Sequence, residues 1–234
     1  MTAFFRFPHT PHVAWLGEGQ PRDDKVLAPS EADALLAGAV VVEEKVDGAN
    51  LGFSIDDQGD LRAQNRGAYL PLDDPQGQWK PLKRWLATRS DALAEALFPD
   101  LMLFGEWCYA VHSVEYTRLP DWFLAFDVYD RARGEFWSAA RRDELAAALG
   151  LAVVPSLGAG HFDLTGLRGL LDRSRLTDGP AEGLYVRSER EGRLTARAKL
   201  VRREFVQAID VHWSKRALQT NTLALGPGGE RAWH

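Results

Sequence analysis

The chain has 234 residues, of which 45% are hydrophobic and 26% are charged. These are ordinary values for a globular protein, so we expect one domain, or one domain with a small appendage, that buries a full core. The single cysteine, Cys108, excludes an internal disulfide framework and a cysteine-rich zinc site, and the formal net charge of −5 argues against a protein that coats nucleic acid without discrimination.

The N-terminal segment lacks a basic region followed by a sustained apolar core, so it predicts no secretory signal. No apolar run approaches the length needed to span a membrane. We therefore expect a cytoplasmic protein with no membrane partner.

The first thirty residues are rich in proline, glycine and histidine and predict an irregular arm laid over the domain. Ser30 is expected to cap a short helix that runs to Ala37, with Asp33 at its third position. Three strands should follow, because apolar runs alternate there with Asp-Gly and Asp-Asp-Gln-Gly turns. Their predicted ranges are 39–45, 51–56 and 61–65.

The rest of the chain mixes helical and strand patterns. Apolar residues near helical spacing predict one helix over 80–97. The later elements, in chain order, are buried strands at 101–104 and 122–126, a helix at 138–149 ended by Gly150, a strand at 151–154, a helix at 163–173, a hairpin with strands at 183–188 and 193–200, a final helix at 202–218 and a loose tail to residue 234. Strands and helices without regular alternation favour an α+β domain with largely antiparallel sheets.

The most informative segment is Lys45-Val46-Asp47-Gly48-Ala49-Asn50, which follows an apolar run. A strand would carry Lys45 to the floor of a pocket, where burial and nearby positive charge lower the pKa of an amine enough to make it nucleophilic. The same residues can also form a surface hairpin, since Asp-Gly is a common turn dipeptide.

Polar residues recur at the ends of the later strands. They are Arg66, Glu106, Asp127 beside Phe126, Glu182, and the pair Arg197 and Lys199. The last two lie two residues apart and therefore share a face of their strand. Taken singly, each has an ordinary explanation, such as a solvated loop cation, a strand-end carboxylate or a hydrogen-bond acceptor in the core.

In this order and at these spacings, the lysine segment and the later residues resemble the ATP-dependent RNA ligase family of the covalent nucleotidyltransferases. The resemblance runs from about residue 40 to residue 205 and is closest to the compact RNA ligases of the second phage type. It implies a nucleotidyltransferase domain, similar to the ATP-grasp fold, of largely antiparallel sheets flanked by helices. We expect that single domain to occupy residues 1–234 without an OB-fold module, since only about 35 residues follow Lys199.

The resemblance also implies roles around the nucleophile. Lys45 would attack the α-phosphorus of ATP and hold AMP through a phosphoramidate bond. Asp47 and Gly48 would shape the turn that aims the lysine. Asn50 would contact the ribose or support the loop, and the backbone beside Glu44 would read the edge of the adenine.

Further roles fall on the later residues. Arg66 would hold the sugar-phosphate and the incoming 5′-phosphate end, Glu106 would accept a hydrogen bond from the ribose, and Phe126 would stack on the adenine. Glu182 would place a catalytic Mg²⁺, with Mn²⁺ as an alternative ion. Asp127 would be either a second metal-site acid or an acceptor within the core.

The late pair would neutralise the α-phosphate. Related RNA ligases usually have lysine at both positions, whereas this chain has Arg197 before Lys199. Arginine keeps the charge but does not release its proton, so a phosphate clamp is compatible with it and a neutral amine is not. Bound metal and Lys199 are the expected causes of a lowered Lys45 pKa.

The resemblance implies RNA as the partner, either a nicked duplex or a broken tRNA, with end-healing enzymes acting beside it. Arg202 and Arg203 are the expected RNA contacts, because cations gather between Arg187 and Lys215. Three alternatives stay open at this point: a small DNA ligase, a nucleotidyltransferase with another acceptor, and a non-catalytic nucleic-acid-binding module with a relict nucleotide pocket.

Overall fold

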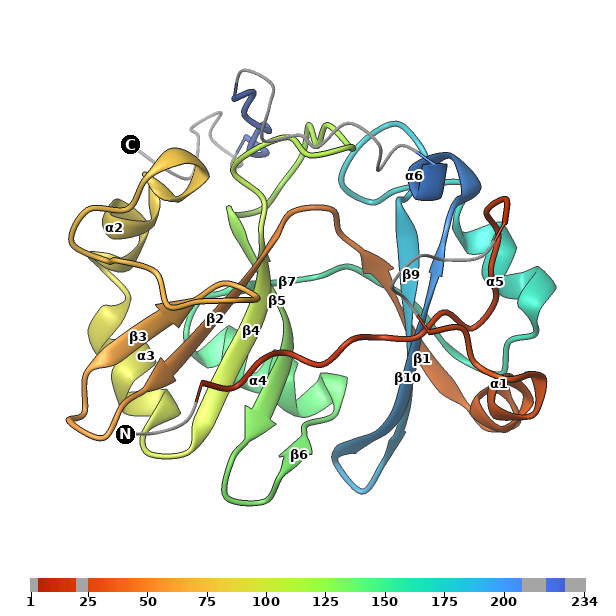
Figure 1. Cartoon of the computed structure of the whole chain (residues 1–234), viewed down its shortest axis with the longest axis horizontal. Helices are drawn as coiled ribbons and strands as arrows, with labels where there is room; N and C mark the ends of the chain where they lie inside the picture. The colour runs from red at the N-terminus through yellow and green to blue at the C-terminus, as the bar shows by residue number, and fades with distance from the viewer. Residues whose placement is uncertain (1–3, 20–24, 208–217, 226–234) are drawn as a thin grey trace.

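Two largely antiparallel β-sheets form the centre of the computed structural model, which describes residues 4–19, 25–207 and 218–225 (Figure 1). One sheet has four strands in the order β10-β9-β1-β8. The other has six, in the order β3-β2-β4-β5-β6, with β7 pairing alongside β5 in parallel. The α+β class predicted from the sequence is confirmed.

The described strands are β1 (Val40–Lys45), β2 (Ala49–Ile55), β3 (Leu61–Gln64), β4 (Leu101–Trp107), β5 (Phe123–Asp130), β6 (Glu135–Phe136), β7 (Ala152–Val153), β8 (Ser156–Gly160), β9 (Gly183–Arg190) and β10 (Arg193–Val201). The described helices are α1 (Pro29–Leu36), α2 (Leu82–Leu86), α3 (Ser90–Leu97), α4 (Ala139–Ala148), α5 (Leu164–Leu170) and α6 (Arg203–Gln207), with a 3₁₀ turn at Gly77–Trp79. None of the helices in the described ranges is long and apolar enough to cross a lipid bilayer.

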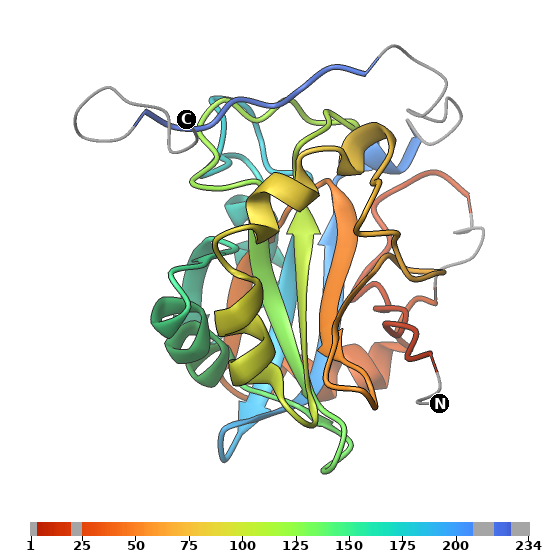
Figure 2. The ribbon, with the colours of Figure 1, turned by 90° about the vertical axis from the view of Figure 1, so that its left-hand side faces the viewer.

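Each sheet has its own apolar core under its own helices. On the six-stranded sheet, Trp85 of α2 stacks on Phe53 of β2 with ring centroids 5.7 Å apart. On the four-stranded sheet, Leu35 of α1 and Leu167 of α5 belong to the same buried cluster as Val42 of β1. Figures 1 and 2 show these helices on the outer sides of the sheets.

The chain passes from one sheet to the other directly after Lys45. β1 belongs to the four-stranded sheet and β2 to the six-stranded sheet, so the residues at 46–48 form the crossing. Gly48 is required there, because a Cβ atom at this position would lie 2.7 Å from the carbonyl oxygen of Trp107. The lysine segment is therefore a junction between sheets and not a surface hairpin.

The predicted helix over 80–97 is wrong in one respect, because it is two helices, α2 and α3. Arg89 leaves the helical region with φ −129° and ψ −18°. A single straight helix would present one continuous face to the core. Here the chain changes direction between α2 and α3, and both Trp85 and Leu93 reach the same core.

The predicted cap of the first helix is also wrong. Ala28 takes the N-cap position and Pro29 is the first helical residue, where its missing N–H costs no hydrogen bond. The Glu31 carboxylate accepts the Ala28 N–H at 2.8 Å. Glu31 thus provides the side-chain hydrogen bond at the start of the helix that was expected from Ser30. The helix predicted over 138–149 is present as α4, and Ser138 is its N-cap, since its side chain accepts from the Arg141 N–H.

Three further comparisons concern the later chain. The sequence did not predict β8, whose glycines carry little strand signal. The final helix begins near the expected position, at Arg203, and its predicted continuation over 208–217 lies outside the described residues. Strands β9 and β10 form the predicted hairpin.

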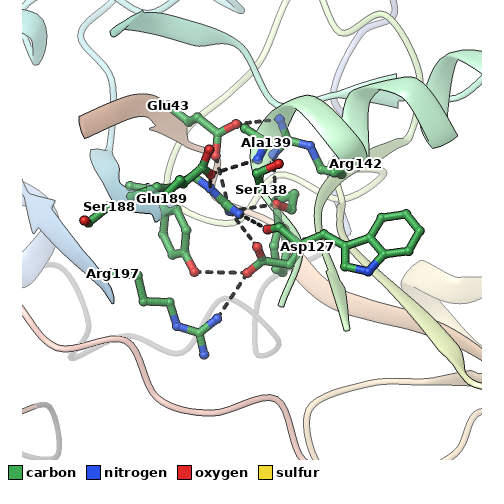
Figure 3. A network of polar contacts seen from close by, with 12 residues as sticks. Glu43, Asp127, Ser138, Ala139, Arg142, Ser188, Glu189 and Arg197 are labelled. Atoms are coloured by element: carbon green, nitrogen blue, oxygen red, sulfur yellow. Dashed lines mark hydrogen bonds and ion pairs between the residues drawn. The ribbon is translucent and has the colours of Figure 1, made fainter. Parts of the chain in front are cut away.

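A buried network of charged groups ties the two sheets together (Figure 3). At its centre is Arg187 of β9, which is 0% exposed and places Nη1 2.6 Å from Oδ1 of Asp127 on β5. Glu43 of β1 lies 3.7 Å from Arg187 and 2.6 Å from Nη2 of Arg142, on α4. Burial of this many charges is stable only if each has an opposite partner, so the network fixes how the sheets sit relative to each other.

Arg187→Met tests that role, because methionine keeps an apolar side chain of similar reach and removes the charge. We expect the free energy of unfolding in urea to fall by about 3–5 kcal/mol, since buried carboxylates lose their main partner. Arg190→Met is the matched control on the same strand, where the side chain is 77% exposed, and it should change the free energy of unfolding by less than about 0.5 kcal/mol. Equal losses in both variants would contradict a bridging role.

Candidate active site

A cavity of about 620 Å³ lies between the two sheets at the crossing of the chain. Strands β1, β2, β4, β5, β9 and β10 all contribute to its wall. Its lining includes these residues predicted from the sequence: Glu44, Lys45, Asp47, Gly48, Asn50, Arg66, Glu106, Phe126 and Lys199. Residues far apart in the sequence are thus gathered around one space.

Lys45 is the last residue of β1, and its side chain points at Glu182, which directly precedes β9. Lys45 lines the cavity, whereas Glu182 is not among the lining residues. Nζ of Lys45 lies 2.8 Å from Oε1 and 2.7 Å from Oε2 of Glu182. The lysine side chain keeps 30% of its surface exposed. The pairing of Lys45 with Gly183 in the β1–β9 ladder brings the two groups together, and a Cβ at Gly183 would lie 2.7 Å from the Leu200 carbonyl oxygen.

The chain's own groups do not produce the expected lowering of the Lys45 pKa. Burial by itself favours the neutral amine, but attraction to Glu182, Glu106 and Asp47 outweighs it and raises the Lys45 pKa. The site therefore holds the lysine as an ammonium ion.

Glu106, the residue before the end of β4, also lines the cavity. Its Oε1 accepts the Gly48 N–H at 3.1 Å. Burial, together with repulsion from Glu182 and Asp47, raises the pKa of Glu106 to about 8 although Lys45 acts to lower it. Burial also raises the pKa of Glu182. At neutral pH the Glu106 carboxyl therefore carries a proton, which it can donate to an oxygen acceptor.

Asp47 and Asn50 show two different uses of the lysine segment. Oδ2 of Asp47 accepts the backbone N–H groups of Ser113 and Val114 at 2.6 and 3.1 Å, and its own N–H donates to the Tyr116 hydroxyl at 2.8 Å. Asp47 thus organises the loop that borders the cavity. Oδ1 of Asn50 is buried and has no hydrogen-bond partner within the described ranges, so it can accept from a bound molecule.

Glu44 holds its side chain away from the reacting groups. Its carboxylate accepts from the Ser174 hydroxyl at 2.5 Å and from the Arg175 N–H at 2.8 Å. Burial raises its pKa. The Glu44 carboxylate is thus already occupied by groups of the chain, and the predicted use of the backbone beside Glu44 in reading a base stays a prediction.

Two predicted site residues have other partners. Asp127 is buried against Arg187, the Tyr185 hydroxyl at 3.0 Å and Nη1 of Arg197 at 3.2 Å, an arrangement that leaves it in the core and does not fit the predicted metal role. Arg197 lies between the rings of Phe7 and Phe136, at 4.6 and 4.5 Å, and is not part of the cavity lining. It supports the wall, which corrects its predicted contact with nucleotide.

Several lining residues were not predicted. Phe7, Thr10, His112 and Tyr185 all face the cavity. Tyr185 follows Glu182 by three positions and pairs with Lys199 across the β9–β10 ladder. Alternation along β9 is the signal that would have found it, whereas the arm residues Phe7 and Thr10 lie in a segment without periodicity.

Arg202 and Arg203 lie beyond the cavity lining, at the start of α6. Arg202 contacts Glu204 at 3.3 Å and the Leu171 carbonyl, and Arg203 pairs with Glu18. Both cations are already partnered by carboxylates of the chain, so any contact with a polyanion would involve an exchange of partners.

The sequence from residue 38 to residue 201 matches the family model described as RNA ligase. The chain belongs to the RNA ligase family. No curated protein matches it. The predicted closeness to the phage-type 2 enzymes stays a prediction.

Solved structures share the fold at low sequence identity. A mutant of Naegleria gruberi RNA ligase with ATP and Mn superposes with a TM-score of 0.62 at 17% identity, over 86% of this chain and 57% of that one. The same ligase with PPi gives 0.57 at 19%, over 79% and 54%. A putative ATP-dependent DNA ligase from Aquifex aeolicus gives 0.53 at 20%, over 85% and 50%. This chain thus spans about half the length of these proteins.

Glu106→Gln tests the raised pKa of Glu106. Between its ordinary value of 4.5 and about 8, the folded state keeps a proton that the unfolded state has released, so stability falls as pH rises through this window. We expect urea unfolding at pH 5 to 8 to show wild type losing up to about 1.4 kcal/mol per pH unit relative to the variant. Glu95→Gln, on the exposed face of α3, should follow wild type, and a wild-type curve parallel to that of Glu106→Gln would contradict the raised pKa.

Proposed function

We propose that this chain is an ATP-dependent RNA ligase that works through a covalent lysyl-AMP intermediate on Lys45. The observation that carries the proposal is the position of Lys45. It lies between carboxylates on one side of a cavity that also contains Arg66, Phe126 and Lys199. Family membership supports the activity, and so does the likeness to the Naegleria ligase, whose structure holds ATP and Mn.

In the first step, Nζ of Lys45 forms a bond to the α-phosphorus of ATP while the bond from that phosphorus to the bridging oxygen breaks and pyrophosphate leaves. The ammonium must first lose a proton, and Glu182, the carboxylate in contact with Nζ, would accept it. Separation of Lys45 from Glu182 then removes the largest of the three attractions that raise the lysine pKa. In-line geometry and neutralised phosphate charge supply the rest of the catalysis.

The carboxylates near Lys45 fit a divalent ion that retains most of its coordinated water. No group of three or more histidine, cysteine, aspartate or glutamate side chains in the described part of the chain is arranged as a metal cage. Mg²⁺ needs only one or two carboxylates beside substrate phosphates, and Glu182 can provide one. The ion would neutralise phosphate charge, and Mn²⁺ would serve in its place.

The remaining residues bind the nucleotide. Phe126 would stack on the adenine, the Glu44 backbone would read its edge, and Asn50 and Glu106 would hold the ribose. Lys199 would neutralise the α-phosphate. Arg66 would take the sugar-phosphate in the first step and the 5′-phosphate of the RNA in the second, when AMP moves from Lys45 to that phosphate.

In the last step, a 3′-hydroxyl attacks the activated 5′-phosphate and releases AMP. A nicked duplex or a broken tRNA would supply such ends, and end-healing enzymes would prepare them. The likeness to the Aquifex protein supports one second candidate, a DNA ligase with the same chemistry. A panel of nicks with RNA or DNA on either side separates the two.

Incubation with ATP labelled at the α-phosphate tests the first step. We expect a protein band that stays labelled through denaturing electrophoresis, and no band with a γ-phosphate label, because pyrophosphate leaves. Lys45→Ala should abolish the band. Lys25→Ala removes a lysine with a 69% exposed side chain and should retain it. Label on the Lys45→Ala protein would refute a lysyl-AMP at this position.

The double variant Arg202→Glu, Arg203→Glu tests the predicted RNA contact. Charge reversal should lower RNA sealing by about tenfold or more and reduce its salt dependence, because fewer phosphates are neutralised. Self-adenylation should be unchanged. Arg190→Glu, at the far end of β9, is the control, and sealing at the wild-type rate in the double variant would place the RNA elsewhere.

A further inference from the structure

The N-terminal arm crosses from one sheet to the other (Figure 1), and two of its residues, Phe7 and Thr10, line the cavity. Near its start it is attached to β3 and the residues after it, since Nε2 of Gln64 donates to the Phe5 carbonyl oxygen at 2.8 Å. Nε of Arg6 likewise donates to the carbonyl oxygen of Arg66 at 3.3 Å. This part of the arm therefore belongs to the six-stranded sheet.

Further along, the arm is attached to β10 of the four-stranded sheet. The N–H of Lys199 donates to the Pro11 carbonyl oxygen at 2.8 Å, and the N–H of Val13 donates to the Lys199 carbonyl oxygen at 2.8 Å. These bonds occupy the edge of β10 that faces away from β9. Lys199 is thus fixed from both sides, by β9 and by the arm.

Between these attachments, the arm turns Phe7 into the cavity wall. Phe7 is 5% exposed and meets the ring of Phe126 edge-on, with centroids 5.3 Å apart. Its ring also lies 4.6 Å from the Arg197 guanidinium. Because Phe7 supports Phe126 from the side, it determines where a base that stacks on Phe126 can lie.

Thr10 is the second arm residue in the wall. It is 8% exposed, lines the cavity and directly precedes Pro11, which holds Lys199. The residues that the structure describes offer its hydroxyl no hydrogen bond, and that oxygen is not fully buried, so it is open to the cavity. A hydroxyl on a cavity wall can donate to a ligand, and beside Lys199 the expected ligand is an anion.

We propose that the arm is a third wall of the nucleotide site, in which the Thr10 hydroxyl donates to a phosphate oxygen of ATP and Phe7 positions the base through Phe126. The inference deepens the proposed function and rests on it. It adds two binding residues that lie outside residues 38–201, the part matched by the family model.

Thr10→Val tests the phosphate contact, because valine has the same shape and no hydroxyl. We would measure dissociation constants of ATP and adenosine by calorimetry, with the full chain carrying Lys45→Ala so that no adduct forms. ATP should bind about tenfold more weakly, as expected for one hydrogen bond to a charged group, while adenosine binding should be unchanged. Thr165→Val, on an exposed position of α5, should bind both as the parent does.

Phe7→Leu tests the wall, because leucine fills part of the space without a ring. The substitution should weaken the binding of ATP and of adenosine by the same factor, since Phe7 acts on the base that both ligands share. Unchanged ATP affinity in Thr10→Val, or equal losses of ATP and adenosine in that variant, would overturn the phosphate contact. Unchanged affinity for both ligands in Phe7→Leu would overturn the role of the wall.

The labelling experiment with the intact lysine separates this inference from the proposed function. If wild type forms the α-labelled adduct while both arm variants bind ATP normally, the arm inference fails and the function stands. If ATP binding depends on Thr10 and no adduct forms on Lys45, the arm holds a nucleotide but the ligase proposal fails.

Discussion

The contact between Lys45 and Glu182 is the interaction on which the rest of the site depends. It forms because Lys45 at the end of β1 pairs with Gly183 at the start of β9, and because glycine at 183 lets the Leu200 carbonyl of β10 approach closely. Three carboxyl groups then surround one amine. Such a cluster is stable without nucleotide only when the amine is charged, so the same field that assembles the site also keeps the nucleophile inactive until its charges are rearranged.

The position of the cavity follows from how the two sheets are joined. The chain crosses between the sheets at 46–48, and the buried network around Arg187 joins their inner faces. The N-terminal arm is a third connection, with hydrogen bonds to both sheets. Arg197 belongs to this framework. A planar guanidinium can pair with Asp127 while it packs between two rings, and a lysine ammonium cannot do both equally well. The departure from the usual lysine at this position therefore has a structural explanation.

The elements with strong local signals were predictable. Apolar runs bounded by turns located β1 to β5, and Ser138 with Gly150 marked both ends of α4. The predictions failed where contacts between segments far apart in the sequence compete with the local pattern. The helix over 80–97 breaks so that Trp85 and Leu93 share one core, and Asp127 turns to arginines from β9 and β10 instead of the cavity.

By itself, the sequence determined the α+β class, the family and most residues that line the cavity, because these depend on residue type and spacing along single strands. Only the tertiary structure decided the charge state of Lys45, the structural use of Asp127 and Arg197, and the presence of Phe7 and Thr10 in the wall. The physical reason is that a pKa, an ion pair or a cavity wall depends on distances between segments that no local pattern encodes.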